Sequence, residues 1–418
     1  MSLQDIIEPK EVEEVLVSHL KENNKIYREG PQPWTIRFSP LNGRGMFATR
    51  DIEQNELIFV DVPILIGPRC TTKHLQLCVC CYKNECPLFP CDRGCGLPVC
   101  STRCENSPKH VNYECKYLRS LVPTCGTDWS PSLLMTVTAV RALFMTEQQR
   151  KCLATLQRDQ SLIYNYEMYV SAAFPIAAGE EITMTYTTLF WDTTLRRQFL
   201  SVTKHFSCMC KRCSDPTEFR SRLAALLCAS DKCSGELLPQ DPLNMTTPWI
   251  CDKCATIISH QQICSIRSGI AAIVEEVLHK TPREIYRFLQ KEFSLLVPWS
   301  NYLIVDLKFR IISYYGRNDG EKWEDLTDTE LDLKIKFCNE LLCLLDTLNC
   351  GDCRKRGLIL YELYCTNLEK IKRCKSNIEK IDENQCLFKK AIAILQNDAV
   401  SEIALKYDKN YFKQLITV

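Results

Sequence analysis

The chain has 418 residues, a length that exceeds one small core and predicts roughly two to four domains. Lys and Arg number 52 and Asp and Glu number 51, so the formal net charge of +1 gives no global field for nucleic acid or an anionic membrane. No apolar run approaches the roughly 18 to 20 residues of a transmembrane helix, and the start, MSLQDIIEPKEVEEVL, lacks a signal-peptide pattern. We therefore expect a protein of the cytoplasm or nucleus with no membrane partner.

The first part of the chain is expected to be mainly β-structure. Four segments combine β-branched and aromatic residues with Gly or Asn-Glu turns, which predicts short strands: WTIRFS, LNGRG, GMFATRDI and NELIFVDVPILIGP. From Ser132 to Leu156 apolar residues recur at three- and four-residue steps, as in an amphipathic helix. Strand-like patterns return in YEMYVSAAF and EEITMTYTTLF, on either side of a Gly-containing turn.

After about Ile263 the pattern becomes helical and stays so. Successive amphipathic stretches have only short polar breaks between them, and such helices usually stack against their neighbours as an α-hairpin array. Two helix starts carry a capping signal, with Thr281 three residues before Glu284 and Thr327 three residues before Glu330. The scattered cysteines of this region, such as Cys338 and Cys343, fall in apolar stretches and are expected to be core residues.

The 27 cysteines are concentrated in groups, with eleven between Cys70 and Cys125 and seven between Cys208 and Cys254. In a reducing compartment, close cysteine spacing indicates metal binding rather than disulfides. The first group contains four close pairs of soft ligands: Cys78 with Cys81, Cys91 with Cys95, Cys100 with Cys104, and His110 with Cys115. Eight such ligands suit two tetrahedral zinc ions. Metal binding, worth roughly 10 to 16 kcal/mol per structural zinc, would supply most of the folding free energy of this small module.

The order of these pairs resembles the MYND zinc finger, in which the first and third pairs share one metal and the second and fourth share the other. The resemblance implies one site of Cys78, Cys81, Cys100 and Cys104 and a second of Cys91, Cys95, His110 and Cys115. Two gaps are one residue longer than in the family, so Cys80 or Cys86 is an alternative ligand. MYND fingers dock proline-containing peptides of partner proteins. Because basic residues are few in this segment, we expect protein binding here rather than DNA binding.

A MYND-like finger placed after a Gly-rich β segment resembles the SMYD family, which joins a SET domain to such a finger. LNGRGMFATRDIEQNELIF matches the family's opening, where a Gly-rich turn approaches S-adenosylmethionine. The resemblance places Asn42, Gly43, Arg44 and Gly45 at this cofactor. Taken alone, the glycines are weak evidence, because Gly more often marks a tight hairpin than a ligand loop.

The segment AAGEEITMTYTTLFWDTTLRRQFLSVTKHFSCMCKRC resembles the end of the SET domain. The match places Tyr186 on the catalytic tyrosine, which orients the substrate lysine, and Phe206 on an aromatic residue of the cofactor and lysine-channel wall. Positioning of a desolvated amine would carry most of this chemistry. The structural alternative for Tyr186 is a tyrosine packed within a strand.

The sequence departs from the family in having no Asn-His-Ser-Cys-x-Pro-Asn run before the final strands of the SET domain. That segment supplies cofactor contacts and the fourth ligand of a post-SET zinc, for which Cys208, Cys210 and Cys213 remain and Cys152 is a conceivable fourth. We therefore expect methyl transfer to be weak or absent, as in an alternatively spliced or degenerated form. A further set, Cys228, Cys233, Cys251 and Cys254, resembles a zinc ribbon found in the arthropod branch of the family, with a structural role.

Together these features predict an α+β protein with a β-rich SET fold, an inserted MYND finger, a post-SET zinc region and a C-terminal TPR-like helical domain. The expected order is an N-terminal helix in 1–32, SET in 33–77, MYND in 78–115, the SET remainder in 116–207, post-SET and ribbon in 208–254, and helices in 263–418. Two functions follow. One is an S-adenosylmethionine-dependent protein-lysine methyltransferase, acting on histone or other lysines in transcriptional regulation. The other is a non-catalytic, zinc-dependent adaptor that binds proline-containing peptides.

Overall fold

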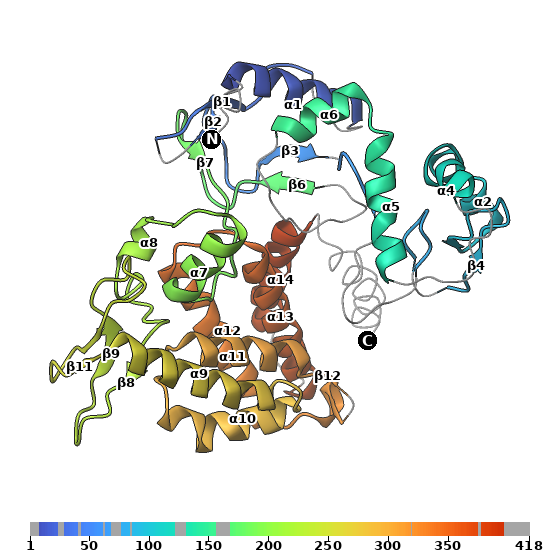
Figure 1. Ribbon diagram of the computed structural model, residues 1–418. Helices are drawn as coiled ribbons and strands as arrows, with labels where there is room; N and C mark the ends of the chain where they lie inside the picture. Colours follow the sequence, from blue (N-terminus) through green and yellow to red (C-terminus); the bar gives the residue numbers. More distant parts are fainter. Residues whose placement is uncertain are drawn as a thin grey trace. The chain divides into compact units, whose positions relative to one another are not determined.

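The computed structural model describes residues 8–23, 29–40, 43–61, 63–67, 77–83, 86–121, 131–155, 168–318, 320–374 and 378–396. The chain forms two compact units (Figure 1), and each is described by itself. The first comprises 1–49, 57–157 and 161–170, and the second comprises 50–56, 158–160 and 171–418. The mixture of strands, zinc-type cysteine clusters and a helical C-terminal region confirms the α+β class.

The β part of the first unit is built from short strands. Strand β1 (Trp34–Phe38) pairs antiparallel with β2 (Arg44–Ala48), and β3 (Leu57–Asp61) pairs with β6 (Met168–Ser171). Helix α1 (Pro9–Asn23) is attached to β1, because the Glu13 carboxylate accepts hydrogen bonds from Thr35 Oγ1 at 2.6 Å and from the Ile36 amide at 2.8 Å. The strands are shorter than the sequence segments that predicted them.

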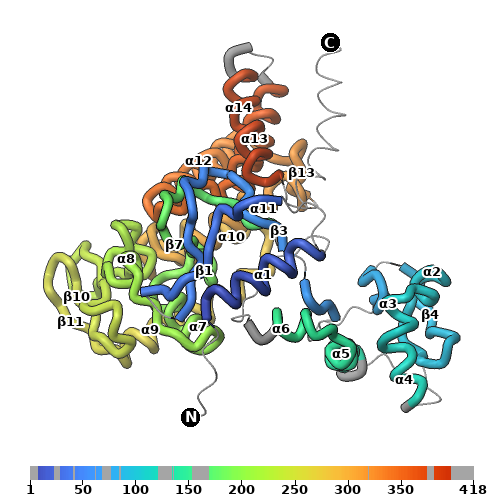
Figure 2. The backbone as a smooth tube through the Cα atoms, turned by 90° about the horizontal axis from the view of Figure 1, so that it is seen from above, coloured from blue at the N-terminus to red at the C-terminus, as the bar shows by residue number. Residues whose placement is uncertain are grey.

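The finger follows β3 and consists of short elements that gather together in Figure 2. They are β4 (Phe89–Pro90), β5 (Pro98–Val99), α2 (Thr102–Glu105), α3 (Pro108–His110), the π-helical turn η1 (Val111–Cys115) and α4 (Lys116–Leu121). The predicted helix 132–156 is two helices, α5 (Pro131–Leu143) and α6 (Glu147–Thr155). The second helix starts anew because Thr146 and Gln149 form a capping box, with side chain-to-backbone hydrogen bonds of 3.2 and 2.9 Å.

The second unit begins with short elements and a ribbon. Its first elements are β7 (Glu181–Ile182), α7 (Thr193–Thr203) and α8 (Lys211–Ser214). The ribbon is a four-stranded antiparallel sheet of β8 (Leu226–Leu227), β9 (Glu236–Pro239), β10 (Trp249–Cys251) and β11 (Ile257–Ile258), in the order β11-β10-β9-β8.

The ribbon packs on the helices of the same unit. Leu223 and Trp249 share one buried core with Leu307 of the helical region. The side-chain amide of Asn301 donates a 2.8 Å hydrogen bond to the Ala225 carbonyl. This bond attaches the start of helix α11 (Tyr302–Tyr314) to the residue directly before β8. This packing accords with the structural role expected for the ribbon.

The helical region contains α9 (His260–Val277), α10 (Pro282–Lys291), η2 (Phe293–Leu295), α11 (Tyr302–Tyr314), β12 (Arg317–Asn318), β13 (Glu321–Lys322), η3 (Trp323–Asp325), α12 (Asp328–Thr347), α13 (Arg354–Cys374) and α14 (Ile378–Leu395). Both predicted capping boxes are present, at Thr281 and Thr327, and Ser259 forms a third. Helices α12, α13 and α14 pack consecutively.

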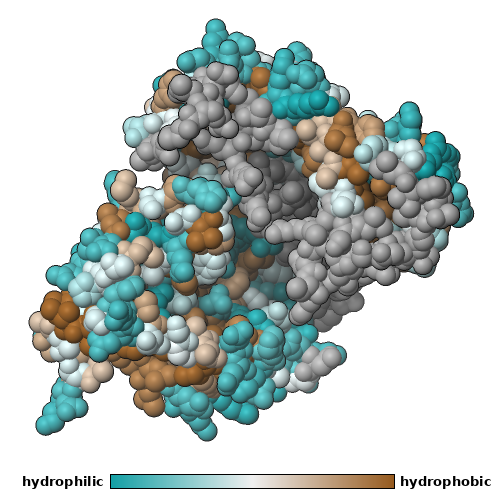
Figure 3. Space-filling view, viewed as in Figure 1, coloured by the Kyte–Doolittle hydropathy of each residue, from teal (hydrophilic) through white to brown (hydrophobic). Residues whose placement is uncertain are grey.

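One core prediction in this region was wrong. Cys338 is fully buried, whereas Cys343 on the same helix is exposed. Five residues advance the helix by about 140°, so the two positions cannot share one narrow apolar face. Within the described ranges, no helix has the length and apolar character needed to cross a membrane. The coloured surface in Figure 3 shows hydrophilic areas interspersed with apolar patches.

Candidate metal centres and SET residues

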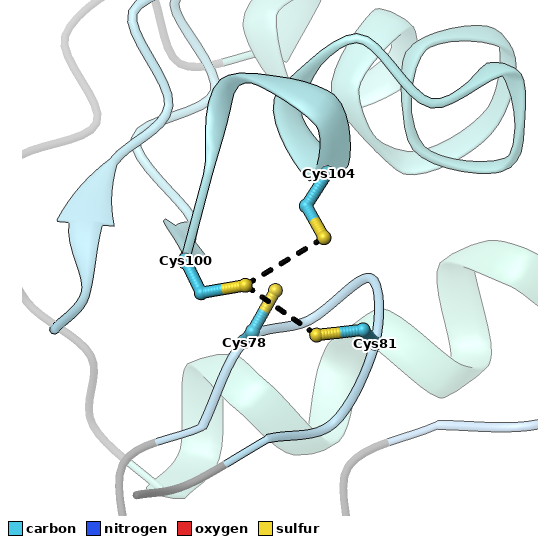
Figure 4. A group of neighbouring side chains, drawn as sticks. All are labelled: Cys78, Cys81, Cys100 and Cys104. Atoms are coloured by element: carbon cyan, nitrogen blue, oxygen red, sulfur yellow. Dashed lines mark hydrogen bonds between the residues drawn. The ribbon is translucent and has the colours of Figure 1, made fainter. Parts of the chain in front are cut away.

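The first predicted ligand group is brought together on two loops of the finger. The sulfur atoms of Cys78, Cys81, Cys100 and Cys104 all lie within 4.8 Å of one another (Figure 4). Cys81 Sγ is 3.5 Å from Cys100 Sγ, and Cys100 Sγ is 3.6 Å from Cys104 Sγ. Ser101 caps α2 by accepting a 3.2 Å hydrogen bond from the Cys104 amide, which sets the spacing of the second pair. The donor set fits a closed tetrahedral zinc site.

The second group is completely buried. Cys91, Cys95, His110 and Cys115 present ligand atoms within 4.8 Å of one another. Nε2 of His110 lies 3.3 Å from Cys91 Sγ and 3.6 Å from Cys95 Sγ. Nε2 is therefore the atom that faces the thiols. This geometry agrees with the expected arrangement, in which the first and third ligand pairs form one site and the second and fourth form the other. Cys80 and Cys86 lie outside both groups. Zinc binding itself stays a prediction.

A buried carboxylate supports the histidine. Nδ1 of His110 lies 3.1 Å from Oε1 of Glu114, and both side chains are fully buried. A hydrogen bond of this kind fixes the tautomer and ring orientation of a metal-binding histidine. Burial raises the pKa of Glu114, but the hydrogen bonds with His110 and Arg141 outweigh burial and hold this pKa below its ordinary value.

Arg141, in helix α5, binds the carboxylate of Glu114. Its Nε donates to Oε2 of Glu114 at 3.0 Å, and its Nη2 contacts the same carboxylate. The remaining N–H groups donate to the carbonyls of Val79 and Ile66, each at 2.9 Å, and to the Tyr82 hydroxyl. The Arg141 guanidinium therefore connects α5 to Glu114, to the segment that contains Ile66 and to the segment that contains Val79 and Tyr82. Sequence reasoning missed Glu114 and Arg141; an acid four residues after a metal-binding histidine was the available signal.

The third group belongs to the ribbon. Cys228 Sγ lies 3.5 Å from Cys254 Sγ, and Cys233 Sγ lies 3.7 Å from Cys251 Sγ. Backbone amides donate to three of these sulfurs at 3.3 to 3.5 Å, which fixes the positions of the sulfur atoms. Gly235 leaves no room for a side chain, because a Cβ atom there would lie 2.5 Å from the Cys251 sulfur. These four cysteines also fit a closed zinc site.

The fourth group has three cysteines, Cys208, Cys210 and Cys213, with sulfurs within 4.8 Å of one another. The conceivable fourth ligand, Cys152, lies in the first unit, where its buried thiol is 3.9 Å from the Val15 carbonyl oxygen. Among the residues that the structure describes, the ligand cluster therefore contains three members.

The two predicted catalytic residues lie together in the second unit. The rings of Tyr186 and Phe206 meet edge to face with centroids 6.1 Å apart, and the Lys204 ammonium lies 5.2 Å from the centre of the Tyr186 ring. Tyr186 follows β7 rather than lying within a strand, and it is 40% exposed. The alternative of a tyrosine packed within a strand is therefore wrong.

The predicted cofactor loop lies in the first unit. Gly43 has φ +62°, which a glycine adopts readily, and its carbonyl accepts a 2.9 Å hydrogen bond from the Ser39 amide. Arg44 and Gly45 begin β2, so this segment closes a hairpin. Asn42 lies outside the described residues, as does 156–167, where the missing Asn-His segment was expected. The role of the loop in cofactor binding stays a prediction.

Comparison with known proteins agrees with this arrangement. A SET domain model matches residues 43–187. Isoform B of the SET domain-containing protein SmydA-8 of Drosophila melanogaster is 28% identical over 413 residues, covering 79% of this chain and 90% of that protein. Isoform A is 26% identical, covering 85% of this chain and 92% of the isoform. The chain therefore contains a SET domain and is similar over most of its length to a protein of the SMYD family.

The SET domain and these relatives support a family of the lysine methyltransferase type. The histone-lysine N-methyltransferase ASHR1 of Arabidopsis thaliana is 29% identical over 121 residues, which cover 28% of this chain and 25% of the plant protein. Tyr186 lies inside the matched SET span, while Phe206 and the three-cysteine cluster follow it.

Proposed function

We propose that this chain is a zinc-dependent protein-binding adaptor whose finger captures a proline-containing segment of a partner. The observation that carries the proposal is an aromatic cluster at the edge of the finger, defined by Tyr113, Tyr117 and Phe144. Phe144 meets Tyr113 at a centroid distance of 5.7 Å and Tyr117 at 6.1 Å, both edge to face. Tyr113 is 40% exposed and the neighbouring Leu143 is 57% exposed.

The aromatic cluster is attached directly to the second metal centre. Tyr113 lies between the ligands His110 and Cys115 in η1, with the irregular backbone angles φ −114° and ψ −105°. Phe144 follows α5 three residues after Arg141, which holds the carboxylate behind His110. Ordering of the metal centre therefore orders the aromatic cluster as well.

Such a surface suits extended proline-rich peptides. A polyproline II segment loses little conformational entropy on binding and docks in aromatic-lined grooves. Basic residues of the finger, such as Lys83 and Arg103, are few, so the surface offers little for a DNA backbone. We therefore propose that the finger binds a protein rather than nucleic acid.

The test is binding of fluorescent peptides that contain Pro-x-x-Pro cores to zinc-loaded full-length protein. Tyr113→Ala is expected to weaken binding roughly tenfold, as for an aromatic anchor at an interface. Tyr314→Ala is the matched control, since Tyr314 is 42% exposed on α11. If no peptide of this class binds, or if both variants behave alike, the proposal fails.

A second candidate function is methyl transfer from S-adenosylmethionine to a protein lysine. It is favoured by the SET match and by the aromatic pair of Tyr186 and Phe206, which suits the wall of a lysine channel. Calorimetry with S-adenosylmethionine on the zinc-loaded protein tests it. Binding of S-adenosylmethionine by the natural chain, together with loss of methyl transfer in Tyr186→Phe, would support an enzyme. If S-adenosylmethionine does not bind measurably, methyl transfer is ruled out and the adaptor function remains.

A further inference from the structure

The three thiols of Cys208, Cys210 and Cys213 lie beside a buried guanidinium that has an unused donor. Nη2 of Arg196 lies 3.9 Å from Cys210 Sγ. Nη1 of the same side chain has no hydrogen-bond partner in the described structure, although Arg196 is only 9% exposed. A buried donor without an acceptor is unfavourable. Cys210 itself is exposed, so the three-cysteine cluster is accessible from solvent on that side.

The charges around the three-cysteine cluster also favour the binding of one more anion. Zn²⁺ with three thiolates has a net charge of −1. Arg196 and Arg197 are both buried beside the cluster, the latter donating a 3.1 Å hydrogen bond to the Cys208 carbonyl, and neither has a carboxylate partner in the described part of the chain. A third buried guanidinium, that of Arg212, is balanced by Glu218 at 3.0 Å. Two uncompensated positive charges therefore face one negative metal–thiolate group.

We propose that Cys208, Cys210 and Cys213 bind zinc with an open fourth position that takes a thiolate from outside the chain. Zinc in a site with three soft ligands is completed well by a fourth sulfur. A fourth thiolate would also place a negatively charged acceptor near the free Nη1 donor of Arg196. The open position makes this group different from the three closed sets of four ligands.

Cys350 is the internal competitor for this position. It interacts electrostatically with Arg196 and Arg212, so it lies in the same region of the second unit. Its sulfur is nevertheless outside the cluster of ligand atoms. An experiment must therefore distinguish an external thiolate from a rearranged Cys350.

The test uses the full chain with Co²⁺ in place of zinc, because cobalt–thiolate bonds absorb in the near ultraviolet. The difference spectrum between the natural chain and Cys210→Ser isolates this site from the others. Free cysteine, added with a non-coordinating phosphine reductant, is expected to raise the absorbance saturably by about a third, as a fourth bond joins three. A Gly-Ser-Cys-Ser-Gly peptide is titrated in parallel. Tighter binding of the peptide assigns the ligand to a protein cysteine, and tighter binding of free cysteine assigns it to a small thiol.

Two variants test the role of the guanidinium. Arg196→Met is expected to weaken thiol binding roughly tenfold while cobalt stays bound. Lys211→Met removes an exposed charge from the start of α8, next to Cys210, and is expected to leave thiol binding unchanged. The proposal is overturned if the site binds no cobalt, if the natural chain shows no thiol response, or if the response appears only in Cys350→Ser.

Discussion

Replacement of Glu114 by Gln should loosen the second metal centre without removing any of its ligands. The variant keeps the size of the side chain but loses the charge that holds His110 and Arg141 at 3.1 and 3.0 Å. Removing a supporting partner of a metal ligand typically costs 10 to 100-fold in metal affinity, or about 1.4 to 2.8 kcal/mol. We expect the upper part of this range, because Glu114 is fully buried and the Arg141 guanidinium loses its charged partner.

The assay is the rate of zinc release from the full chain to a competing chromogenic chelator, followed together with thermal unfolding. Glu114→Gln should release one zinc equivalent at least tenfold faster than the natural chain. Glu147→Gln, at the exposed start of α6, is the control and should release zinc at the natural rate. Equal rates for all three proteins would show that the carboxylate does not support a metal-bound histidine.

Two further predictions concern the second unit. The hydrogen bond from Arg283 lowers the pKa of Glu330 from 4.5 to about 2, so its contribution to stability is complete above pH 4.5 and is lost as the pH falls toward 2. Glu330→Gln should lower the free energy of unfolding by on the order of 1 to 3 kcal/mol at pH 7, and a difference from the natural chain that does not shrink at pH 3 would contradict this. Gly235→Ala should displace the sulfur of Cys251, cost about 1 to 3 kcal/mol and promote loss of the ribbon zinc. Gly269→Ala, with open space around the new methyl group in α9, should not, and equal metal content in both variants would refute the steric argument.

The ligand groups were predictable from sequence because each pair is formed by local chain geometry. Cys100 and Cys104, for example, are fixed by the first turn of one short capped helix. The supporting residues were not predictable in this way. Arg141 is 27 residues from Glu114, and only the packing of α5 on the finger brings them together. Long-range contacts of this kind leave no spacing pattern in the sequence.

The helical region shows the same division between local and tertiary signals. The Thr281 and Thr327 capping boxes were found because each needs only four consecutive residues. Helix α11 lacks a single apolar stripe, because it is buried on several faces, including Val305, Leu307 and Ile312. Tyr186 lies near the end of the SET match, and its ring contact with Phe206, 20 residues further along the chain, has no spacing signal in the sequence.

The shared core of the ribbon and the helices makes metal loss at the ribbon a global event for the second unit. At the start of α11, Asn301 and Tyr302 donate hydrogen bonds of 2.8 and 2.9 Å to carbonyls of the segment directly before β8, and Trp249 of the ribbon belongs to the same core as Leu307. Local opening of the ribbon would therefore expose helix surfaces as well. The two parts should protect their amides from hydrogen exchange as one cooperative block, and a chelator should lower that protection as far away as α12.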